Sequence, residues 1–217
     1  VRQIGKLQLF EGIREADLQA MMACAGGKVY SYKKGEIIIL TDDHVRNVGV
    51  VLSGCVHMVK ESPSGNEVLL TIIREGELFG ESFALGDEAL AYTTFRADKK
   101  TEILSIPFQK IMNTCTNECP FHHQLIKNVV VMIANKNVRL MEKIDVSSRK
   151  GLREKIVAYI ELEAKKQHKS CVELKHNRTV WADYLGVNRS ALARELTGMK
   201  EEGILDFEGN LIWLKDR

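Results

Sequence analysis

Residues 179–200, TVWADYLGVNRSALARELTGMK, combine two short helical patterns around a single glycine. The first pattern places apolar residues at helical spacing after Thr179, a residue suited to capping a helix. Gly186 supplies the backbone freedom that a tight turn needs, and Asn188 stands where it can cap the second helix. This stretch therefore predicts a helix-turn-helix.

The second helix of this motif has an apolar stripe and a cationic side. Leu192, Leu196 and Met199 form the stripe at i, i+4 and i+7, while Arg189 and Arg194 occupy other faces. Early residues of such a helix reach base edges in the major groove, where arginine is the commonest reader of guanine. The residues expected to contact double-stranded DNA are Thr179, Asn188, Arg189, Ser190, Arg194 and Lys200.

A short hairpin is expected directly after the helix-turn-helix. The helix closes at Gly203, and the apolar runs ILDF (204–207) and LIWL (211–214) flank a turn of Glu208, Gly209 and Asn210. A helix-turn-helix followed by such a hairpin is a winged helix. A wing usually lies over the phosphate backbone, although the acidic Glu208 at its tip argues against an anion contact from that residue.

Composition limits the classes of protein that the chain can represent. Its 217 residues suffice for two domains, and a formal net charge of +2 provides no global attraction for nucleic acid, so DNA affinity must come from local basic clusters. The sequence contains no apolar run long enough to cross a membrane and no signal-peptide pattern. Five scattered cysteines fit reduced thiols, so a cytoplasmic location without membrane attachment is expected.

The first half of the chain predicts a helix and then many short strands. Residues 7–24 read as one amphipathic helical region, and its expected buried side chains are Ile13, Leu18, Met21 and Met22. From Lys28 onward, β-branched runs alternate with glycines, as in an antiparallel β-roll or barrel. A hairpin turn is expected at residues 64–66.

A long helix should follow the roll. Residues 121–150 contain neither proline nor glycine, and apolar positions with one Asn recur in steps of four and three at Ile126, Val130, Ile133, Asn137, Leu140 and Ile144. This pattern is a coiled-coil seam, on which an Asn fixes register and favours a dimer. The alternative is that the helix packs only on its own domain. The expected domains are residues 1–106, a sensing roll with its N-terminal helix; 107–148, the dimerisation helix and hinge; and 149–217, the winged helix.

The order of these parts resembles the Crp/Fnr family of bacterial transcription regulators. The resemblance spans nearly the whole chain and rests on YKKGEIII (32–39), residues 51–81 ending in GELFGE, LREKIVAYI (152–160) and DYLGVNRSALAREL (183–196). It implies an α+β fold: an antiparallel, jelly-roll-like β-roll, a long dimerisation helix and a C-terminal winged helix-turn-helix. It also implies a homodimer on a palindromic operator. Many family members carry a Glu where Ser190 stands, so a different half-site is expected here.

The resemblance also bears on the effector. Cyclic-nucleotide-binding members hold the phosphate with an Arg-Ser pair after the FGE turn, and a gapless comparison places Ala91 and Tyr92 there. Without a cation a buried phosphate would be unpaired, so cyclic AMP is not the expected effector. One N-terminal cysteine, Cys24, excludes the iron-sulfur cluster of the oxygen-sensing members. A different small molecule, if any, should contact Glu81, Ser82, Tyr92, Thr93 and Arg139; no cofactor is identified.

Other functional classes have weaker support in the sequence. An enzyme is not expected, because the strand region has only His44 and His57, without the paired histidines of a cupin metal site, and no nucleotide-binding glycine motif occurs. A metal or thiol redox sensor using Cys115 and Cys119, with His122 and His123, remains open although Pro120 interrupts the segment. So does a ligand-sensing module whose C-terminal domain contacts protein. Effector identity, target genes and any contact with RNA polymerase are not encoded in a recognisable pattern.

Overall fold

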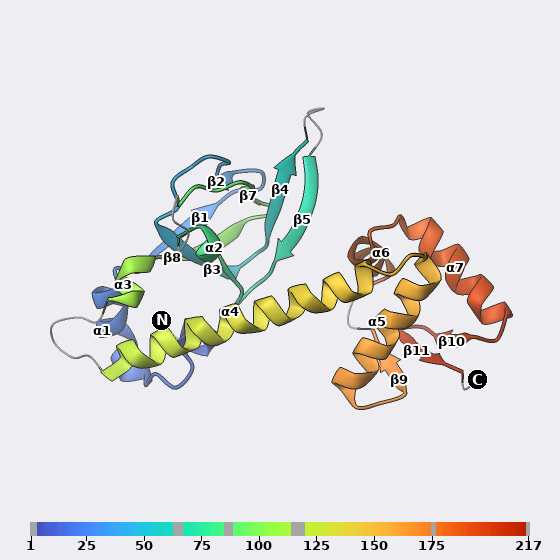
Figure 1. Ribbon diagram of the computed structural model, residues 1–217. Helices are drawn as coiled ribbons and strands as arrows, with labels where there is room; N and C mark the ends of the chain where they lie inside the picture. Colours follow the sequence, from blue (N-terminus) through green and yellow to red (C-terminus); the bar gives the residue numbers. More distant parts are fainter. Residues whose placement is uncertain (1–3, 63–66, 85–88, 114–119, 175–176, 216–217) are drawn as a thin grey trace. The chain divides into compact units, whose positions relative to one another are not determined.

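A computed structural model describes residues 4–62, 67–84, 89–113, 120–174 and 177–215 (Figure 1). The chain forms two compact units, residues 1–133 and 134–217. The expected α+β fold, with an antiparallel roll, a long helix and C-terminal helices, is confirmed. None of the described helices is long and apolar enough to span a membrane. The division into units falls inside the long helix, and the expected domain boundaries stay predictions.

The first unit contains two four-stranded antiparallel sheets. One has the order β1-β8-β3-β6, formed by β1 (Lys28–Tyr32), β8 (Thr101–Pro107), β3 (Asn47–Ser53) and β6 (Leu78–Phe79). The other has the order β2-β7-β4-β5, formed by β2 (Ile37–Ile39), β7 (Thr94–Ala97), β4 (Val56–Glu61) and β5 (Glu67–Ile73). Buried residues of both sheets share one core, which includes Val51, Val56, Phe95 and Ile103. The β4 and β5 strands pair as a hairpin, and the turn expected between them at residues 64–66 lies outside the described residues.

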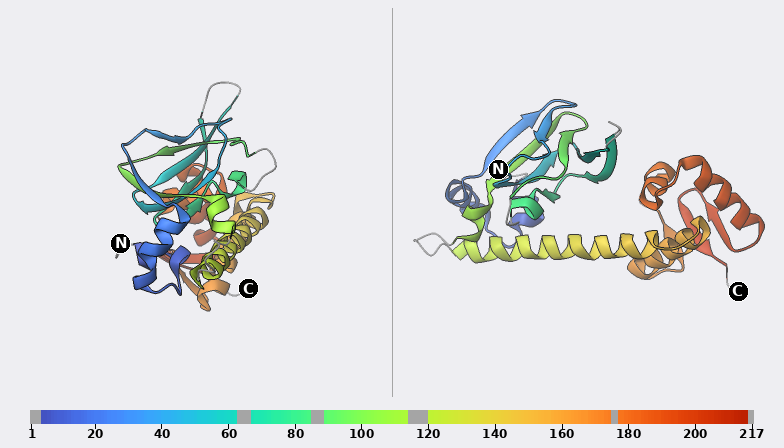
Figure 2. Two further views of the ribbon diagram at one scale, coloured as in Figure 1. Left: turned by 90° about the vertical axis from the view of Figure 1, so that its left-hand side faces the viewer. Right: turned by 45° about the horizontal axis from the view of Figure 1, so that its top comes forward.

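Helices close one end of this roll, as Figure 2 shows. A second core joins α1 (Glu15–Ala25) and α3 (Phe108–Met112) to the beginning of α4 (Pro120–Ser147) and to β3 and β8. Its fully buried members include Leu18, Ile111, Leu125 and Val129. The short helix α2 (Glu81–Ala84) follows β6.

The N-terminal segment differs from the single helix expected over residues 7–24. Two 3-10 turns, η1 (Ile4–Lys6) and η2 (Gln8–Phe10), precede α1. Gly12, between η2 and α1, has a φ of +77°, a left-handed conformation that ends a helical path. Leu18 and Met21 are buried as expected, but Ile13 and Met22 are only partly buried, and Leu9 and Phe10 are the residues that η2 buries.

The second unit is a helical domain with a small sheet. It contains α5 (Leu152–Gln167), α6 (Arg178–Leu185) and α7 (Arg189–Glu201). The expected hairpin is present as β10 (Leu205–Glu208) and β11 (Leu211–Leu214), and β9 (Cys171–Glu173), which was not expected, pairs with β11. One core joins Val146 near the end of α4 to these helices and strands.

Candidate nucleic-acid interface and effector region

The helix-turn-helix is built from α6 and α7. Gly186 ends α6 with a φ of +70°, and the backbone N–H of Val187 donates to the Ala182 carbonyl at 3.0 Å, which closes the helix and starts the turn. The expected cap of α6 was wrong. Asn177, and not Thr179, is the N-cap, because its side-chain oxygen accepts from the Val180 N–H at 3.0 Å. Thr179 lies within the first turn of α6.

The beginning of α7 has the expected cap. The Asn188 side-chain oxygen accepts from the Ala191 N–H at 2.7 Å and from the Ser190 hydroxyl at 2.8 Å. The Ser190 hydroxyl therefore donates its only proton to the Asn188 side chain. Its oxygen lone pairs are left to accept hydrogen bonds. Asn188, Arg189 and Ser190 are consecutive in the sequence, so the hydrogen bonds of the Asn188 cap also fix the backbone of the first residues of α7.

One face of α7 is buried and the other is free. Leu192, Leu196 and Met199 are buried in the core of the second unit, as the stripe predicts. Arg189 and Arg194 are exposed, and within the described part of the chain neither forms an ion pair. Two unpaired guanidinium groups on an anchored helix are available for phosphate or guanine contacts.

Lys200 has a different position from the other expected DNA contacts. Its Nζ is 2.6 Å from an Asp206 carboxylate oxygen, donates to the Phe207 carbonyl at 3.3 Å and lies over the Phe207 ring at 4.8 Å. The hydrogen bond from Lys200 is the main cause that lowers the pKa of Asp206 to about 2. Lys200 therefore holds α7 against the hairpin, and its charge is already partly neutralised.

Arg178 is a residue that the set of expected contacts omitted. Its guanidinium stacks on both Trp181 and Phe207 at 5.2 Å from each ring, and its Nη2 donates to the Gly209 carbonyl at 3.4 Å. Burial lowers its pKa, and its Nη1 is buried without a partner among the described residues. Arg178 thus joins α6 to the wing. The sequence signal was its place directly after the cap Asn177.

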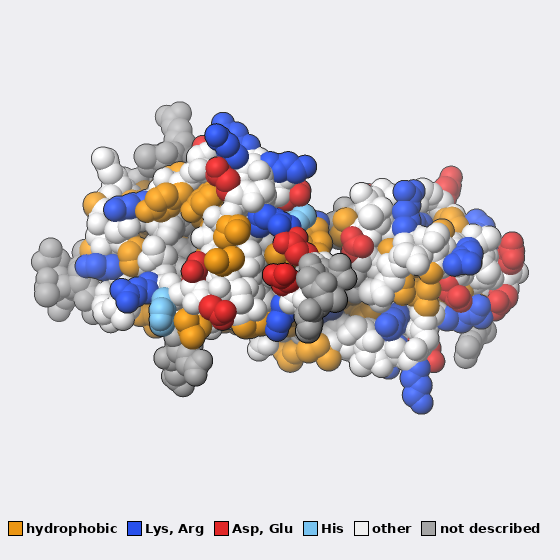
Figure 3. All heavy atoms as spheres, turned by 90° about the horizontal axis from the view of Figure 1, so that it is seen from above, with side chains coloured by type: hydrophobic (Ala, Val, Ile, Leu, Met, Phe, Trp, Pro, Cys, Tyr) orange, Lys and Arg blue, Asp and Glu red, His pale blue; other side chains and the backbone are white. Residues whose placement is uncertain are grey.

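Two other arginines of the second unit are paired with carboxylates. Arg153 on α5 contacts Glu195 at 2.9 Å and Glu202 at 2.6 Å, both at α7, and Arg149 contacts Asp145 at 2.6 Å. In Figure 3 the lysine and arginine side chains of the visible face are interspersed with aspartate and glutamate. Charges of opposite sign are therefore mixed on this face.

The exposed side of α4 carries much of the expected seam. Val130, Leu140 and Ile144 are 55%, 54% and 64% exposed. Ile126 and Ile133 are partly buried against the core of the first unit. Met141, at 55% exposure, adds apolar surface one turn before Ile144. Each of these four side chains therefore leaves about half of its surface exposed.

The residues expected to contact an effector differ in their exposure. Glu81 and Thr93 are buried, and Thr93 Oγ1 has no hydrogen-bond partner among the described residues. Ser82 and Tyr92 are exposed, and Lys60 Nζ lies 5.1 Å from the Tyr92 ring centre. Arg139 belongs to the second unit. The expectation that these five residues contact one effector therefore stays a prediction.

A pocket of about 470 Å³ lies elsewhere in the first unit. Residues of β1, β3 and β8 and the segment between β2 and β3 line it, among them Tyr30, Tyr32, Asp43, His44 and Arg46. Burial is the main cause that raises the pKa of Tyr32. None of the five expected effector residues lines this pocket.

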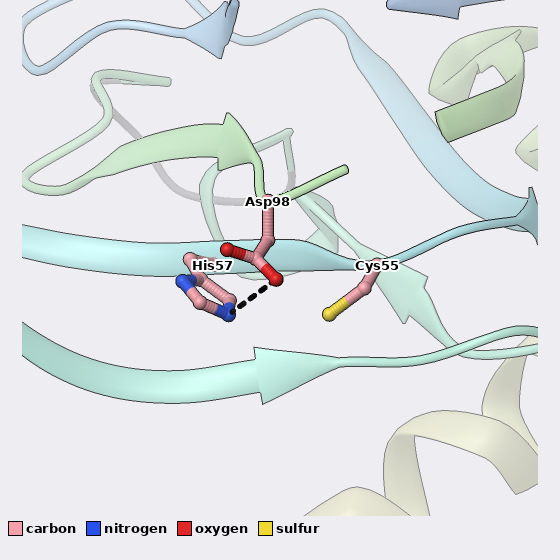
Figure 4. A group of neighbouring side chains, drawn as sticks. All are labelled: Cys55, His57 and Asp98. Carbon is pink, nitrogen blue, oxygen red and sulfur yellow. Dashed lines mark ion pairs between the residues drawn. The ribbon is translucent and has the colours of Figure 1, made fainter. Parts of the chain in front are cut away.

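Three potential metal ligands meet on the other sheet of the roll (Figure 4). The ligating atoms of Cys55, His57 and Asp98 all lie within 4.8 Å of one another, and His57 Nε2 is 3.8 Å from an Asp98 oxygen. Burial and the nearby Asp98 raise the pKa of the Cys55 thiol. The sequence signal was the Cys-x-His spacing at the start of β4, which puts both side chains on one face of a strand.

The alternative sensor site is only partly visible. Cys115 and Cys119 lie outside the described residues. His122 is buried, with Nε2 3.3 Å from the Lys110 carbonyl oxygen, and His123 is exposed. These contacts assign a structural place to His122 in the helical core and leave the thiol hypothesis as a prediction.

Comparisons with known proteins agree with this architecture. Residues 29–118 match the family described as cyclic nucleotide-binding domain, while no curated protein is significantly similar to the sequence. The c-di-GMP responsive global regulator CLP of Xanthomonas campestris is 18% identical, with a TM-score of 0.61, covering 94% of this chain and 100% of that chain.

Two further solved structures are similar over most of the chain. FixK2 from Bradyrhizobium japonicum is 20% identical, with a TM-score of 0.54 over 88% of this chain and 93% of its own. A CRP-family transcriptional regulator from Thermus thermophilus is 21% identical, with a TM-score of 0.50 over 86% of this chain and 92% of its own. The chain therefore has the fold of the Crp/Fnr family of transcription regulators, with a roll that matches the cyclic nucleotide-binding domain.

Proposed function

We propose that this protein is a sequence-specific DNA-binding transcription regulator and not an enzyme. The observation that carries the proposal is the arrangement of α7, whose apolar stripe is anchored in a core while Arg189 and Arg194 stand exposed and unpaired among the described residues. The wing braces the same helix through Lys200 and Asp206. A braced helix can deliver its early side chains to base edges with little loss of conformational entropy.

The protein acts as a homodimer on a palindromic operator. The exposed seam residues Val130, Leu140 and Ile144 support pairing of two copies of α4. A two-fold dimer would place its two reading helices in successive major grooves about 34 Å apart, so the operator should be an inverted repeat. Contacts with RNA polymerase would depend on whether the bound protein activates transcription.

The effector is proposed to be a small molecule other than cyclic AMP. Ala91 is fully buried and apolar at the position where the family resemblance places the phosphate-binding arginine, and Tyr92 beside it is exposed. A buried phosphate diester needs a cation, and an alanine cannot supply one. Calorimetric titration with cyclic AMP should give no binding at micromolar concentrations; saturable binding in that range would refute this inference.

The experiment that tests the regulator proposal is selection of bound duplexes from a randomised DNA pool, followed by anisotropy titration of the recovered sequence. We expect one inverted repeat. Arg194→Ala should reduce discrimination between that repeat and random DNA by about 1–3 kcal/mol, the usual value of a bidentate arginine–guanine contact. Unchanged discrimination would exclude Arg194 as a reader.

A matched control separates base reading from general loss of positive charge. Arg14→Ala removes an exposed arginine that is paired with Asp17 in the first unit, so it should leave both affinities unchanged. Affinity of the native protein should also fall by orders of magnitude between low and physiological salt, because phosphate contacts release counterions. If the C-terminal domain contacted protein instead, the selection would recover no DNA sequence and the titration would show no DNA affinity.

A further inference from the structure

We propose that Cys55, His57 and Asp98 form a binding site for a zinc-like divalent cation on the sheet β2-β7-β4-β5. The site is separate from the helix-turn-helix and does not depend on the proposed DNA binding. It rests on three different donor groups that the strands bring to one face.

Strand register is the reason that these residues meet. Cys55 and His57 are two positions apart, so their side chains leave the strand on the same face, opposite to the fully buried Val56 between them. Val56 pairs with Ala97 in β7, and the Asp98 N–H donates to the Cys55 carbonyl at 3.1 Å. Asp98 therefore lies directly across from Cys55. Side chains at such opposite positions of two antiparallel strands are close enough to touch.

The backbone beneath the site is held in place. The Cys55 N–H donates to Thr101 Oγ1 at 3.1 Å, and this hydroxyl lies 3.1 Å from the Cys55 carbonyl oxygen. Gly54 has a φ of +96°, and a Cβ there would approach the Lys100 carbonyl oxygen at 2.6 Å. This fixed turn sets the direction of the Cys55 side chain before any ion arrives, which lowers the cost of assembling the site.

The donor atoms decide which ion fits. A thiolate, an imidazole and a carboxylate suit zinc and related borderline-soft cations, whereas calcium and magnesium prefer oxygen ligands alone. Zinc bonds of roughly 2.0–2.3 Å separate tetrahedral ligand atoms by about 3.3–3.8 Å. His57 Nε2 is 3.8 Å from an Asp98 oxygen, and all three ligating atoms lie within 4.8 Å of one another. Small side-chain rotations would therefore bring them to the separations that zinc requires.

The fourth coordination position is left to water. Among the described residues no fourth ligand joins the group, so the site would be open and the ion exchangeable. On binding, an S–Zn bond replaces the S–H bond of Cys55 and the proton passes to solvent. The Asp98 side chain is 46% exposed and that of His57 24%, so an ion can reach the ligands from solution.

The test is titration of the untagged, chelator-treated full chain with zinc in competition with a chromophoric chelator, followed by titration with cobalt. We expect one equivalent of zinc and, with cobalt, a thiolate charge-transfer band. Cys55→Ser should abolish the band, and Asp98→Asn should weaken zinc binding by at least about tenfold, since even outer partners of metal ligands are worth 10–100-fold. An unchanged affinity in both variants would overturn the proposal.

Two controls make the result specific. The double variant Cys115→Ser/Cys119→Ser and the single variant Cys171→Ser remove thiols elsewhere and should retain both the stoichiometry and the band. Loss of the band in the double variant would assign the metal to the other segment and overturn the proposal. Asp98 is half exposed, so Asp98→Asn should retain the circular dichroism and unfolding midpoint of the native chain. Loss of binding is then a loss of a ligand and not of the fold.

Discussion

Removal of the α7 cap should destabilise the second unit by a measurable and specific amount. In Asn188→Ala the side-chain oxygen that accepts from Ala191 and Ser190 is lost. N-cap replacements of this kind cost about 1 kcal/mol, with a range of roughly 0.5–2 kcal/mol. For a unit of this size, a loss of about 1 kcal/mol lowers the melting temperature by about 4–8 °C.

Both tryptophans make this measurement selective. Trp181 in α6 and Trp213 in β11 lie in the second unit, so tryptophan fluorescence during urea denaturation follows that unit alone. With a slope of about 1 kcal/mol per molar urea, the midpoint should fall by about 1 M. Asn188→Asp is the control, because a carboxylate accepts the same bond and is favoured at a helix N-terminus. If the alanine and aspartate variants unfolded together, the capping argument would be refuted.

Three further changes test other contacts. Ile144→Asp should convert a dimer to a monomer in sedimentation at micromolar concentration, because it places a charge on the apolar seam; a native monomer would contradict the dimer itself. The folded-state pKa of Asp206 is lowered to about 2, so its contribution to stability is present above about pH 4 and is lost as pH falls toward 2; Asp206→Asn should flatten this acid dependence of the tryptophan transition. Gly54→Ala should cost the first unit about 1–3 kcal/mol in calorimetry, because its Cβ meets backbone at a positive φ; an unchanged transition would mean that the turn relaxes freely.

Elements with strong local signals could be predicted from the sequence. The strands between glycines, the Gly186 turn and the final hairpin are confirmed. Each depends on residues close together in the chain. The single N-terminal helix and the Thr179 cap were wrong for related reasons. A left-handed Gly12 interrupted one pattern, and Asn177 two residues earlier was the better acceptor for the other.

The contacts of individual site residues were harder to predict from the sequence. The ion pair of Lys200 could not be predicted from helix periodicity, because its partner Asp206 lies beyond the end of α7. Arg178 stacks on a ring of α6 and on a ring of the wing, and no local pattern shows that these rings come together. The expected DNA contacts all stay predictions: Thr179, Asn188, Arg189, Ser190, Arg194 and Lys200.

The sequence by itself determined the order of the parts, the apolar stripe of α7 and the cap that begins it, because helix periodicity and capping act within a few residues. Only the tertiary structure decided which charges remain unpaired and which donors share a face. Cys55 and Asp98 are distant in the chain and meet because β4 and β7 pair in one register. Register depends on the packing of the whole roll, and a shift of β7 by one residue against β4 would turn Asp98 to the face opposite to Cys55 and His57.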